Sequence, residues 1–205
     1  ASVQALAQRL ETLERALTEI ESRFLTLRQK YGDEDIGLFS LFLLNLVHLE
    51  RGEALYTEAG VPHAYLGGDI VECMANSDNV IRAGLTPKYK DVATLVDILK
   101  PVTEAPLVEG EPQDGEIVYR TPASEFLVSR LALAAYETRH ATPADGPELY
   151  LVTQGVVNAS WSDEDATMTF ERGESYFVPA GLARLDLTAR VESELFRVRV
   201  PKPED

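Results

Sequence analysis

The segment RGEALYTEAGVPH, residues 51–63, recurs as RGESYFVPAGLAR, residues 172–184, at a constant offset of 121 positions. Each copy has the pattern of a Gly-Glu turn, a short strand and a second glycine turn that presents one side chain, His63 in the first copy and Arg184 in the second. A small jelly-roll barrel can use this order of elements to aim a side chain into its cavity. Because an arginine does not lose its proton, it cannot ligate a metal, so only the first copy could hold one.

Short apolar runs separated by glycine and proline turns continue this β pattern through most of the chain after Gly32. No long helical period interrupts the later runs, which favours an antiparallel sandwich or barrel. Strands are expected at residues 43–49, 54–57, 64–66, 70–74, 126–134, 148–153, 156–161, 166–170, 175–178 and 195–200.

The N-terminal thirty residues carry apolar side chains in alternating steps of three and four. That period predicts one amphipathic helix over residues 3–31. The helix starts at Ala1 without a cap, as expected of a chain cut from a longer polypeptide. A dimeric coiled coil is the alternative, but Arg23 would then face Arg28, so we favour a helix packed on its own domain.

Two further segments break the β pattern. Residues 91–99 predict a short helix that ends at Lys100, because the proline that follows disfavours a helical residue before it. Residues 101–122 hold four prolines and an acidic cluster, which indicates an irregular connection over the surface.

The composition is that of an ordinary globular protein, with 205 residues of which 45% are apolar and 26% charged. Its 34 acidic and 19 basic side chains give a net charge of −15, whose field repels phosphate backbones, so nucleic acid is not an expected partner. The longest apolar run, residues 37–47, is about half as long as a spanning helix needs, so no membrane anchor is expected. Cys73 is the single cysteine, which favours a reducing, cytoplasmic setting without a disulfide.

One of the three histidines stands out by its setting. His63 follows Pro62 in a turn, which fixes the backbone and leaves the ring free to project. The alternative is a satisfied interior histidine, because zinc takes three or four protein donors and the chain does not obviously supply the others. His48, on an expected strand, and His140, in a loop-like stretch, are interpreted as structural or exposed.

Polar side chains crowd residues 69–91, and the simplest interpretation is a solvated loop. Against it, Glu72 and Arg82 each lie between two apolar neighbours, so both could project from strands into the space that His63 faces. An anionic substrate inside so acidic a protein needs local cations, and Arg82 and Lys88 are suited to that role.

These residues carry a resemblance to a known family. The pattern GEALY at 52–56, PHAYL at 62–66, GDIVECM at 68–74 and SDNVIRAGLTPK at 77–88 resembles type I mannose-6-phosphate isomerases. Weaker likeness extends to residues before and after this stretch. The resemblance implies a zinc-dependent enzyme of two cupin barrels and a helical domain that interconverts mannose 6-phosphate and fructose 6-phosphate.

By position, the resemblance implies that His63 is the family's last metal ligand and that Arg82 is the arginine beside the reacting carbons. Tyr65, Glu72 and Lys88 fall where the family lines its substrate cleft, with Lys88 a candidate for the phosphate and Glu72 a candidate for proton transfer. The family's other zinc ligands come from a barrel that precedes the helical domain. That missing N-terminal cupin segment of the same protein is therefore an expected partner beside the sugar phosphate, and these residues alone are expected to be inactive.

The expected architecture is mainly β, with cupin (jelly-roll) barrels and an N-terminal helical segment. A non-catalytic cupin that binds or senses a sugar phosphate is an alternative, but it has no reason to carry both Arg82 and Lys88 after His63. A different cupin enzyme would keep two or three histidines in one barrel, and this chain has one there. The expected parts are the end of the helical domain (1–36), a cupin segment with the metal and substrate motif (37–100), a connecting loop (101–122) and a C-terminal cupin barrel without metal (123–205).

Overall fold

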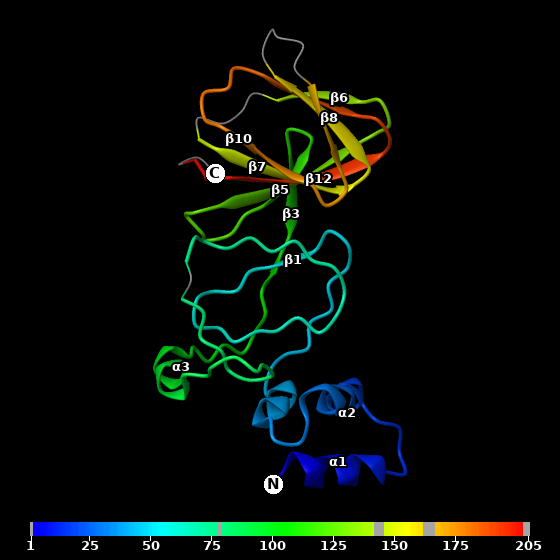
Figure 1. The fold of residues 1–205 in the computed structure, drawn as a ribbon, viewed down its shortest axis with the longest axis vertical. Helices are drawn as coiled ribbons and strands as arrows, with labels where there is room; N and C mark the ends of the chain where they lie inside the picture. The colour runs from blue at the N-terminus through cyan, green and yellow to red at the C-terminus, as the bar shows by residue number, and fades with distance from the viewer. Residues whose placement is uncertain (1, 78, 142–145, 162–166, 203–205) are drawn as a thin grey trace. The chain divides into compact units, whose positions relative to one another are not determined.

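The computed structural model describes residues 2–77, 79–141, 146–161 and 167–202. Ala1 and Ala166, which the sequence assigns to a helix start and a strand, lie outside the described residues, as does Asp78. The chain divides into two compact units (Figure 1). The first comprises Ala1–Glu50, Leu55–Asp69 and Ser77–Pro106, and the second comprises Arg51–Ala54, Ile70–Asn76 and Leu107–Asp205.

The first unit opens with two α-helices and a 3₁₀ helix, which are α1 (Val3–Glu11), α2 (Glu19–Tyr31) and η1 (Ile36–Phe42). The expected single helix over residues 3–31 is therefore wrong, because residues 12–18 interrupt it. Among the described residues, no helix combines the length and the apolar character needed to cross a bilayer.

Side chains that bond to the backbone cause this break. The Thr12 hydroxyl donates to a carbonyl one turn back at 3.1 Å, and α1 ends there. Thr18 starts α2 with a capping box, in which its hydroxyl accepts from the Glu21 N–H at 3.3 Å and the Glu21 carboxylate accepts from the Thr18 N–H at 2.7 Å. Ser2 caps α1 by accepting from the Ala5 N–H at 3.1 Å, so the expected uncapped start is also wrong.

The apolar stripe predicted from the spacing of three and four packs within this unit. The apolar stripe is buried within the first unit, so these helices pack on their own domain, as we expected, rather than forming a dimeric coiled coil. The buried members of the cluster are Val3, Ala7, Leu10, Phe24 and Leu38.

The Glu21 carboxylate makes the start of α2 sensitive to pH. A hydrogen bond from Arg15, together with the one from the Thr18 N–H, lowers the pKa of Glu21 from 4.5 to about 2. A carboxylate with a lowered folded-state pKa stabilises the fold above its unfolded pKa, and this contribution is lost as the pH falls from 4.5 through 2. We expect the melting-temperature difference between the wild type and Glu21→Gln to be constant near neutral pH and to shrink across that window. Thermal unfolding at a series of pH values measures it, and a pH-independent difference would contradict the assignment.

Most strands expected in the first half of the chain do not form. Residues 43–49, 64–66 and 70–74 are not in strands, and the run at 54–57 is shortened to β1 (Ala54–Leu55), which forms a two-stranded sheet with β2 (Leu107–Val108). An alternating sequence sets the two faces of a strand, but a strand also needs a neighbour that takes up its backbone hydrogen bonds. Among the described residues, the other segments have no such neighbour.

The short helix expected near residue 95 is confirmed as α3 (Val92–Ile98). It begins at Asp91, whose carboxylate accepts from the Thr94 N–H at 3.0 Å and from the Thr94 hydroxyl at 2.7 Å. Its last helical residue lies three positions before Pro101, as the proline predicts.

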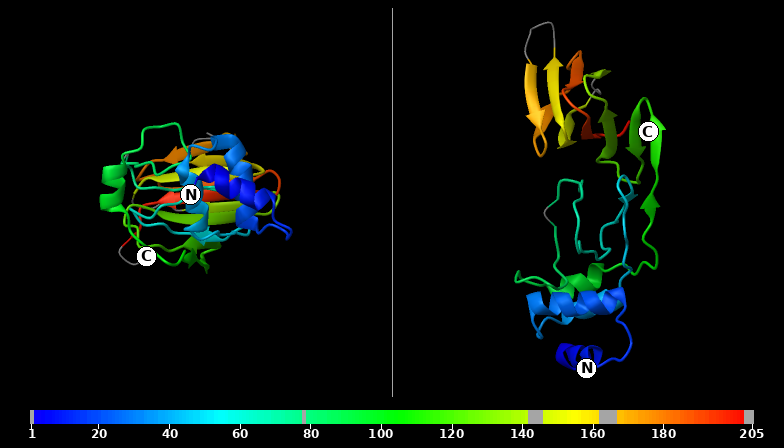
Figure 2. Two further views of the ribbon diagram at one scale, coloured as in Figure 1. Left: turned by 90° about the horizontal axis from the view of Figure 1, so that it is seen from below. Right: turned by 90° about the vertical axis from the view of Figure 1, so that its right-hand side faces the viewer.

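The second unit contains two antiparallel sheets, seen as separate layers in Figures 1 and 2. The six-stranded sheet has the order β10-β7-β12-β5-β4-β3, and the four-stranded sheet has the order β6-β11-β8-β9. Their buried faces form one apolar core that includes Leu131, Tyr150, Val157, Leu187 and Leu195. This architecture confirms the antiparallel sandwich or barrel expected for the later part of the chain. The strands are β3 (Gly110–Gln113), β4 (Glu116–Tyr119), β5 (Leu127–Leu133), β6 (Thr138–Ala141), β7 (Glu148–Gln154), β8 (Val156–Trp161), β9 (Thr167–Glu171), β10 (Ser175–Val178), β11 (Leu185–Ala189) and β12 (Ser193–Arg199).

The interval 101–122, expected to be irregular, contains the β3–β4 hairpin. Its two turn residues, Asp114 and Gly115, have φ of +50° and +75°. Two consecutive residues with positive φ match the type I′ turn, for which Asp-Gly is a preferred pair. The prediction is wrong here because the prolines and acidic residues concealed a two-residue hairpin signal.

The repeated segments share their backbone conformation at both glycine turns. Gly52 and its counterpart Gly173 have φ of +94° and +89°, and Gly60 and its counterpart Gly181 have φ of +87° and +82°. Glycine adopts this left-handed region at little cost, whereas other residues rarely do. The sequence echo therefore reflects a repeated structural turn.

Candidate functional site

His63 is exposed and follows the turn at residues 59–60 in the first unit, so the alternative of a satisfied interior histidine is wrong. Its Nδ1 is 3.0 Å from the backbone oxygen of Val61, and its ring meets the edge of Tyr65 with ring centres 5.9 Å apart. A carbonyl oxygen only accepts, so this contact favours the tautomer with the proton on Nδ1. The Nε2 lone pair is then available to a metal, in the arrangement common for ligating histidines.

The chain does not complete a metal site among its described residues. No group of three or more His, Cys, Asp or Glu side chains in that part of the chain could hold an ion. Zinc takes three or four protein donors, so His63 fits the chemistry of a zinc ligand but supplies one donor of the set.

Asp35 holds the segment that carries the two candidate cations, and the sequence did not single it out. Its carboxylate accepts from the Gly37 N–H at 2.8 Å, at the start of η1, and from the Leu85 N–H at 3.0 Å. Lys90 lies 3.8 Å from the same carboxylate. One side chain therefore joins two segments fifty residues apart.

Arg82 and Lys88 lie three residues before and after Leu85, the residue that bonds to Asp35. Both are exposed, and among the described residues neither side chain has an ion pair. In a chain of net charge −15, two unneutralised cations on one fixed segment suit an anionic group.

Gly84 makes the closest backbone approach in this segment. A Cβ built at Gly84 would lie 2.8 Å from the Gly37 Cα, whereas one built at Gly67 would meet nothing within 4 Å. We therefore expect Gly84→Ala to push the segment off η1 and to lower the melting temperature of the first unit by several degrees, since a backbone atom cannot yield as a flexible side chain does. Gly67→Ala is the matched control and should leave it unchanged. Equal melting temperatures for the two variants would contradict this close packing.

Tyr65 and Glu72 are both exposed. Tyr65 lies beside the imidazole of His63, as a lining residue of the same site would. Glu72 belongs to the second unit and not to the unit that holds His63, and its role in proton transfer stays a prediction. Its neighbour Cys73 is half-buried, and desolvation raises the pKa of the thiol, which makes it a poor nucleophile.

Arg184, the counterpart of His63 in the second copy, forms an ion pair with Asp186. The Arg184 Nε lies 2.9 Å from the Asp186 carboxylate, and the same carboxylate lies 2.8 Å from the Nδ1 of His140. The hydrogen bond from Arg184, followed by the one from His140, lowers the pKa of Asp186. His140 lies on β6 and not in a loop, and it is exposed, as expected. His48 is also exposed, and its ring pairs with Glu19.

Comparison with known proteins points to one family, although no family model matches the chain. Mannose-6-phosphate isomerase 2 of Arabidopsis thaliana is 41% identical over 175 residues, which cover 84% of this chain and 39% of that protein. The mannose-6-phosphate isomerase of Bos taurus is 40% identical over 182 residues, covering 84% and 43%. The crystal structure of mannose 6-phosphate isomerase from Salmonella typhimurium, bound to its substrate and a zinc atom, has a TM-score of 0.80 at 31% identity, covering 98% of this chain and 49% of that one.

The chain thus spans less than half the length of these curated relatives, and it aligns with the C-terminal half of them. The neighbouring structures share its mainly β, cupin architecture, which confirms the fold class expected from the sequence. In sequence and in fold, the chain belongs to the mannose-6-phosphate isomerase family and corresponds to the C-terminal half of its members.

Proposed function

We propose that this chain contributes the C-terminal part of the active site of a zinc-dependent isomerase, which interconverts mannose 6-phosphate and fructose 6-phosphate through an enediol. His63 is the residue on which the proposal depends, because its Nδ1 faces the Val61 carbonyl and its Nε2 is left for a metal. The relatives named mannose-6-phosphate isomerase and the neighbour bound to substrate and zinc support it. A cytoplasmic location goes with this function and with the single cysteine.

The exchange moves a proton between neighbouring carbons, so the site must polarise a carbonyl, remove a carbon-bound proton and neutralise an oxyanion. Zinc, when bound, supplies Lewis-acid polarisation and positive charge, and His63 is this chain's donor to it. The Arg82 guanidinium provides a fixed cation at the enediolate oxygens. The Lys88 ammonium binds the phosphate, which turns remote binding energy into orientation of the reacting carbons.

The remaining roles fall to two further side chains. Tyr65, beside the His63 imidazole, lines the substrate cleft and helps to keep the ring oriented. The Glu72 carboxylate is the chain's candidate for carrying the proton between the carbons. Since His63 is one donor of a set, we infer that the other zinc ligands lie on polypeptide outside these 205 residues and that the chain alone is inactive.

Metal analysis tests the proposal directly. In the longer polypeptide that supplies the other donors, His63→Ala should weaken zinc retention by more than about 100-fold, because loss of a ligand exceeds the 10- to 100-fold cost of losing an outer-shell partner. The matched control is His48→Ala, which removes an exposed imidazole that pairs with Glu19 and should leave zinc stoichiometric. A His63→Ala variant that keeps its zinc would remove this residue from the ligand set.

A coupled assay with mannose 6-phosphate separates an isomerase from a non-catalytic sugar-phosphate sensor. We expect turnover in the longer polypeptide and none in the 205 residues alone. Turnover by the isolated chain, free of contaminating enzyme, would refute the incomplete site, and binding without turnover in the longer polypeptide would favour the sensor.

A further inference from the structure

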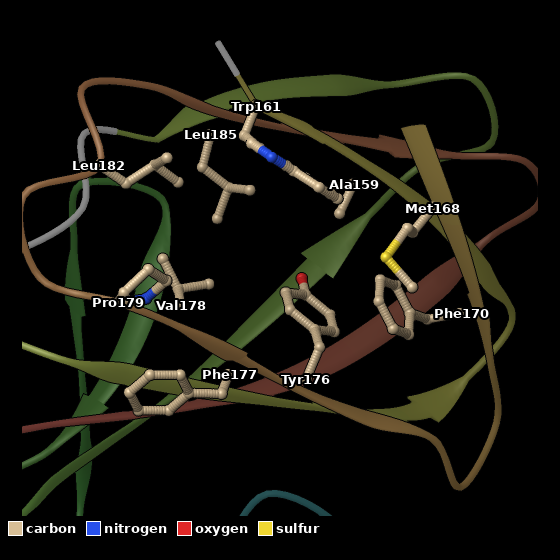
Figure 3. Close-up of a pocket in the computed structure, with 10 residues that line it drawn as sticks. All are labelled: Ala159, Trp161, Met168, Phe170, Tyr176, Phe177, Val178, Pro179, Leu182 and Leu185. Carbon is tan, nitrogen blue, oxygen red and sulfur yellow. The ribbon is translucent and has the colours of Figure 1, made fainter. Parts of the chain in front are cut away.

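The C-terminal barrel contains a cavity of about 300 Å³, lined by residues other than those proposed to act on sugar phosphate (Figure 3). Its walls come from β8, β9, β10 and β11 and are apolar or aromatic, with no charged side chain among the described residues that line it. Two of its lining residues, Met168 and Phe177, are 53% and 65% exposed. Further lining residues include Ala159, Trp161, Phe170, Val178 and Leu185.

The Tyr176 hydroxyl points into this cavity (Figure 3). It is buried and has no hydrogen-bond partner among the described residues. Its ring is held by stacking on Phe170, with centres 4.2 Å apart, and on Tyr150, with centres 5.1 Å apart. In folded proteins about nine in ten or more buried polar groups have a hydrogen-bond partner. A buried hydroxyl without one has lost its hydrogen bonds to water and gained none in exchange, which costs free energy. A hydroxyl that is held in one orientation and lacks a partner, in an otherwise apolar cavity, indicates a bound molecule that would accept its hydrogen bond.

We infer that the C-terminal barrel binds a small uncharged molecule with an apolar, ring-shaped body and one hydrogen-bond acceptor, which the Tyr176 hydroxyl contacts. The aromatic and aliphatic walls suit a ring, and the mouth of a β-barrel is a common place for such a site. The volume is about twice that of the ~150 Å³ engineered cavity that holds benzene, which suits a body of two fused rings.

The charge of the cavity walls and the protonation of Tyr176 restrict the class of ligand further. The described walls carry no cation, and the net charge of −15 disfavours an anion. Burial raises the pKa of Tyr176, so the hydroxyl keeps its proton at neutral pH and can donate it to a carbonyl or ether oxygen. This inference does not depend on zinc or on His63.

The probes 1-indanone and indane have the same fused-ring body and differ by one carbonyl oxygen. We expect both to bind the full 205-residue chain, with 1-indanone about 3- to 10-fold tighter, as one neutral hydrogen bond contributes. Tyr176→Phe keeps the ring and removes the hydroxyl, so it should bind both probes equally. Titration followed by NMR chemical shifts measures the affinities.

Met168→Trp is the filling variant, and it should weaken the binding of both probes at least tenfold because the larger side chain at this lining position takes up part of the cavity. Its melting temperature shows whether the fold is kept, and Leu182→Trp fills the same cavity if it is not. No binding of either probe to the wild type would overturn the inference. A preference for 1-indanone that survives Tyr176→Phe, or binding unaffected in the filled variants, would overturn it as well.

Discussion

Replacing Arg197 by alanine is expected to lower the free energy of unfolding of the C-terminal barrel by about 3–5 kcal/mol. The guanidinium donates to the Glu148 carboxylate through Nε at 3.0 Å and again through Nη2, and it donates to Glu116 at 3.0 Å. Glu148 is 1% exposed and also accepts from the Tyr150 hydroxyl at 2.9 Å. Without the guanidinium, the buried Glu148 carboxylate loses two charge-assisted hydrogen bonds and a positive charge in contact with it, and this is the source of the large loss.

The effect of this substitution extends across both sheets. Arg197 and Glu148 lie on β12 and β7 of the six-stranded sheet, and Glu116 on β4 of the same sheet bonds at 3.2 Å to Arg139 on β6 of the other. Burial tends to lower the pKa of Arg197, but the hydrogen bonds that it donates to Glu148 and the nearby negative charge outweigh burial, and the pKa is raised. The guanidinium is therefore charged at every pH at which the barrel folds.

Denaturant unfolding at neutral pH measures the loss. The matched control is Arg190→Ala, the same substitution at an exposed position of the same unit, which should change the free energy of unfolding by no more than about 0.5 kcal/mol. Comparable losses for the two variants would show that the buried pairs do not stabilise the barrel beyond an ordinary surface arginine.

The C-terminal strands could be predicted from sequence because each alternates between a buried and an outward face. Leu127–Leu133 and Glu148–Gln154 show that alternation in their burial, and their partners lie in the same chain. The strands β6 and β11 were not predicted. Thr138–Ala141 is short and mostly polar, and its apolar support comes from β11 rather than from its own side chains.

The opposite error, strands predicted where none form, has a physical cause. Residues 64–66 and 70–74 have the local composition of strands, but periodicity does not report whether a neighbouring strand exists. Strand propensity depends on the local sequence, whereas the hydrogen-bond ladder of a sheet requires two segments.

For the candidate site, the motif identified the residues proposed to face a ligand and missed those that hold them. His63, Arg82 and Lys88 could be found because their residue types and spacing resemble a family. Asp35 could not, since its bond to the Leu85 backbone crosses fifty residues and every residue type except proline would supply the same N–H at that position. Likewise, the charges of Glu148 and Arg197 pair across 49 residues, a distance at which sequence pattern carries no signal.

We expect two substitutions to change different kinetic constants of the proposed isomerase: Arg82→Ala should lower kcat, and Lys88→Ala should raise KM. Arg82 would act on charge that develops only in the transition state, and removal of one such donor costs about 10²- to 10³-fold in kcat with little change in KM. Lys88 would hold a phosphate that is charged in substrate and transition state alike, so its loss should raise KM by about 10- to 100-fold and leave kcat within a few-fold. Steady-state kinetics on the longer polypeptide measures both constants.

The fixed geometry around Asp35 makes this comparison specific, because Arg82 and Lys88 flank the same Leu85 anchor and would shift together if the segment moved. Lys100→Ala, which removes an exposed ammonium paired with Glu58 at 3.3 Å, controls for the loss of one positive charge and should change neither constant. Arg82→Lys retains the charge without the planar fork and should recover only part of kcat. Equal losses of kcat in Arg82→Ala and Lys88→Ala would mean that both residues support the segment rather than dividing transition-state and phosphate contacts between them.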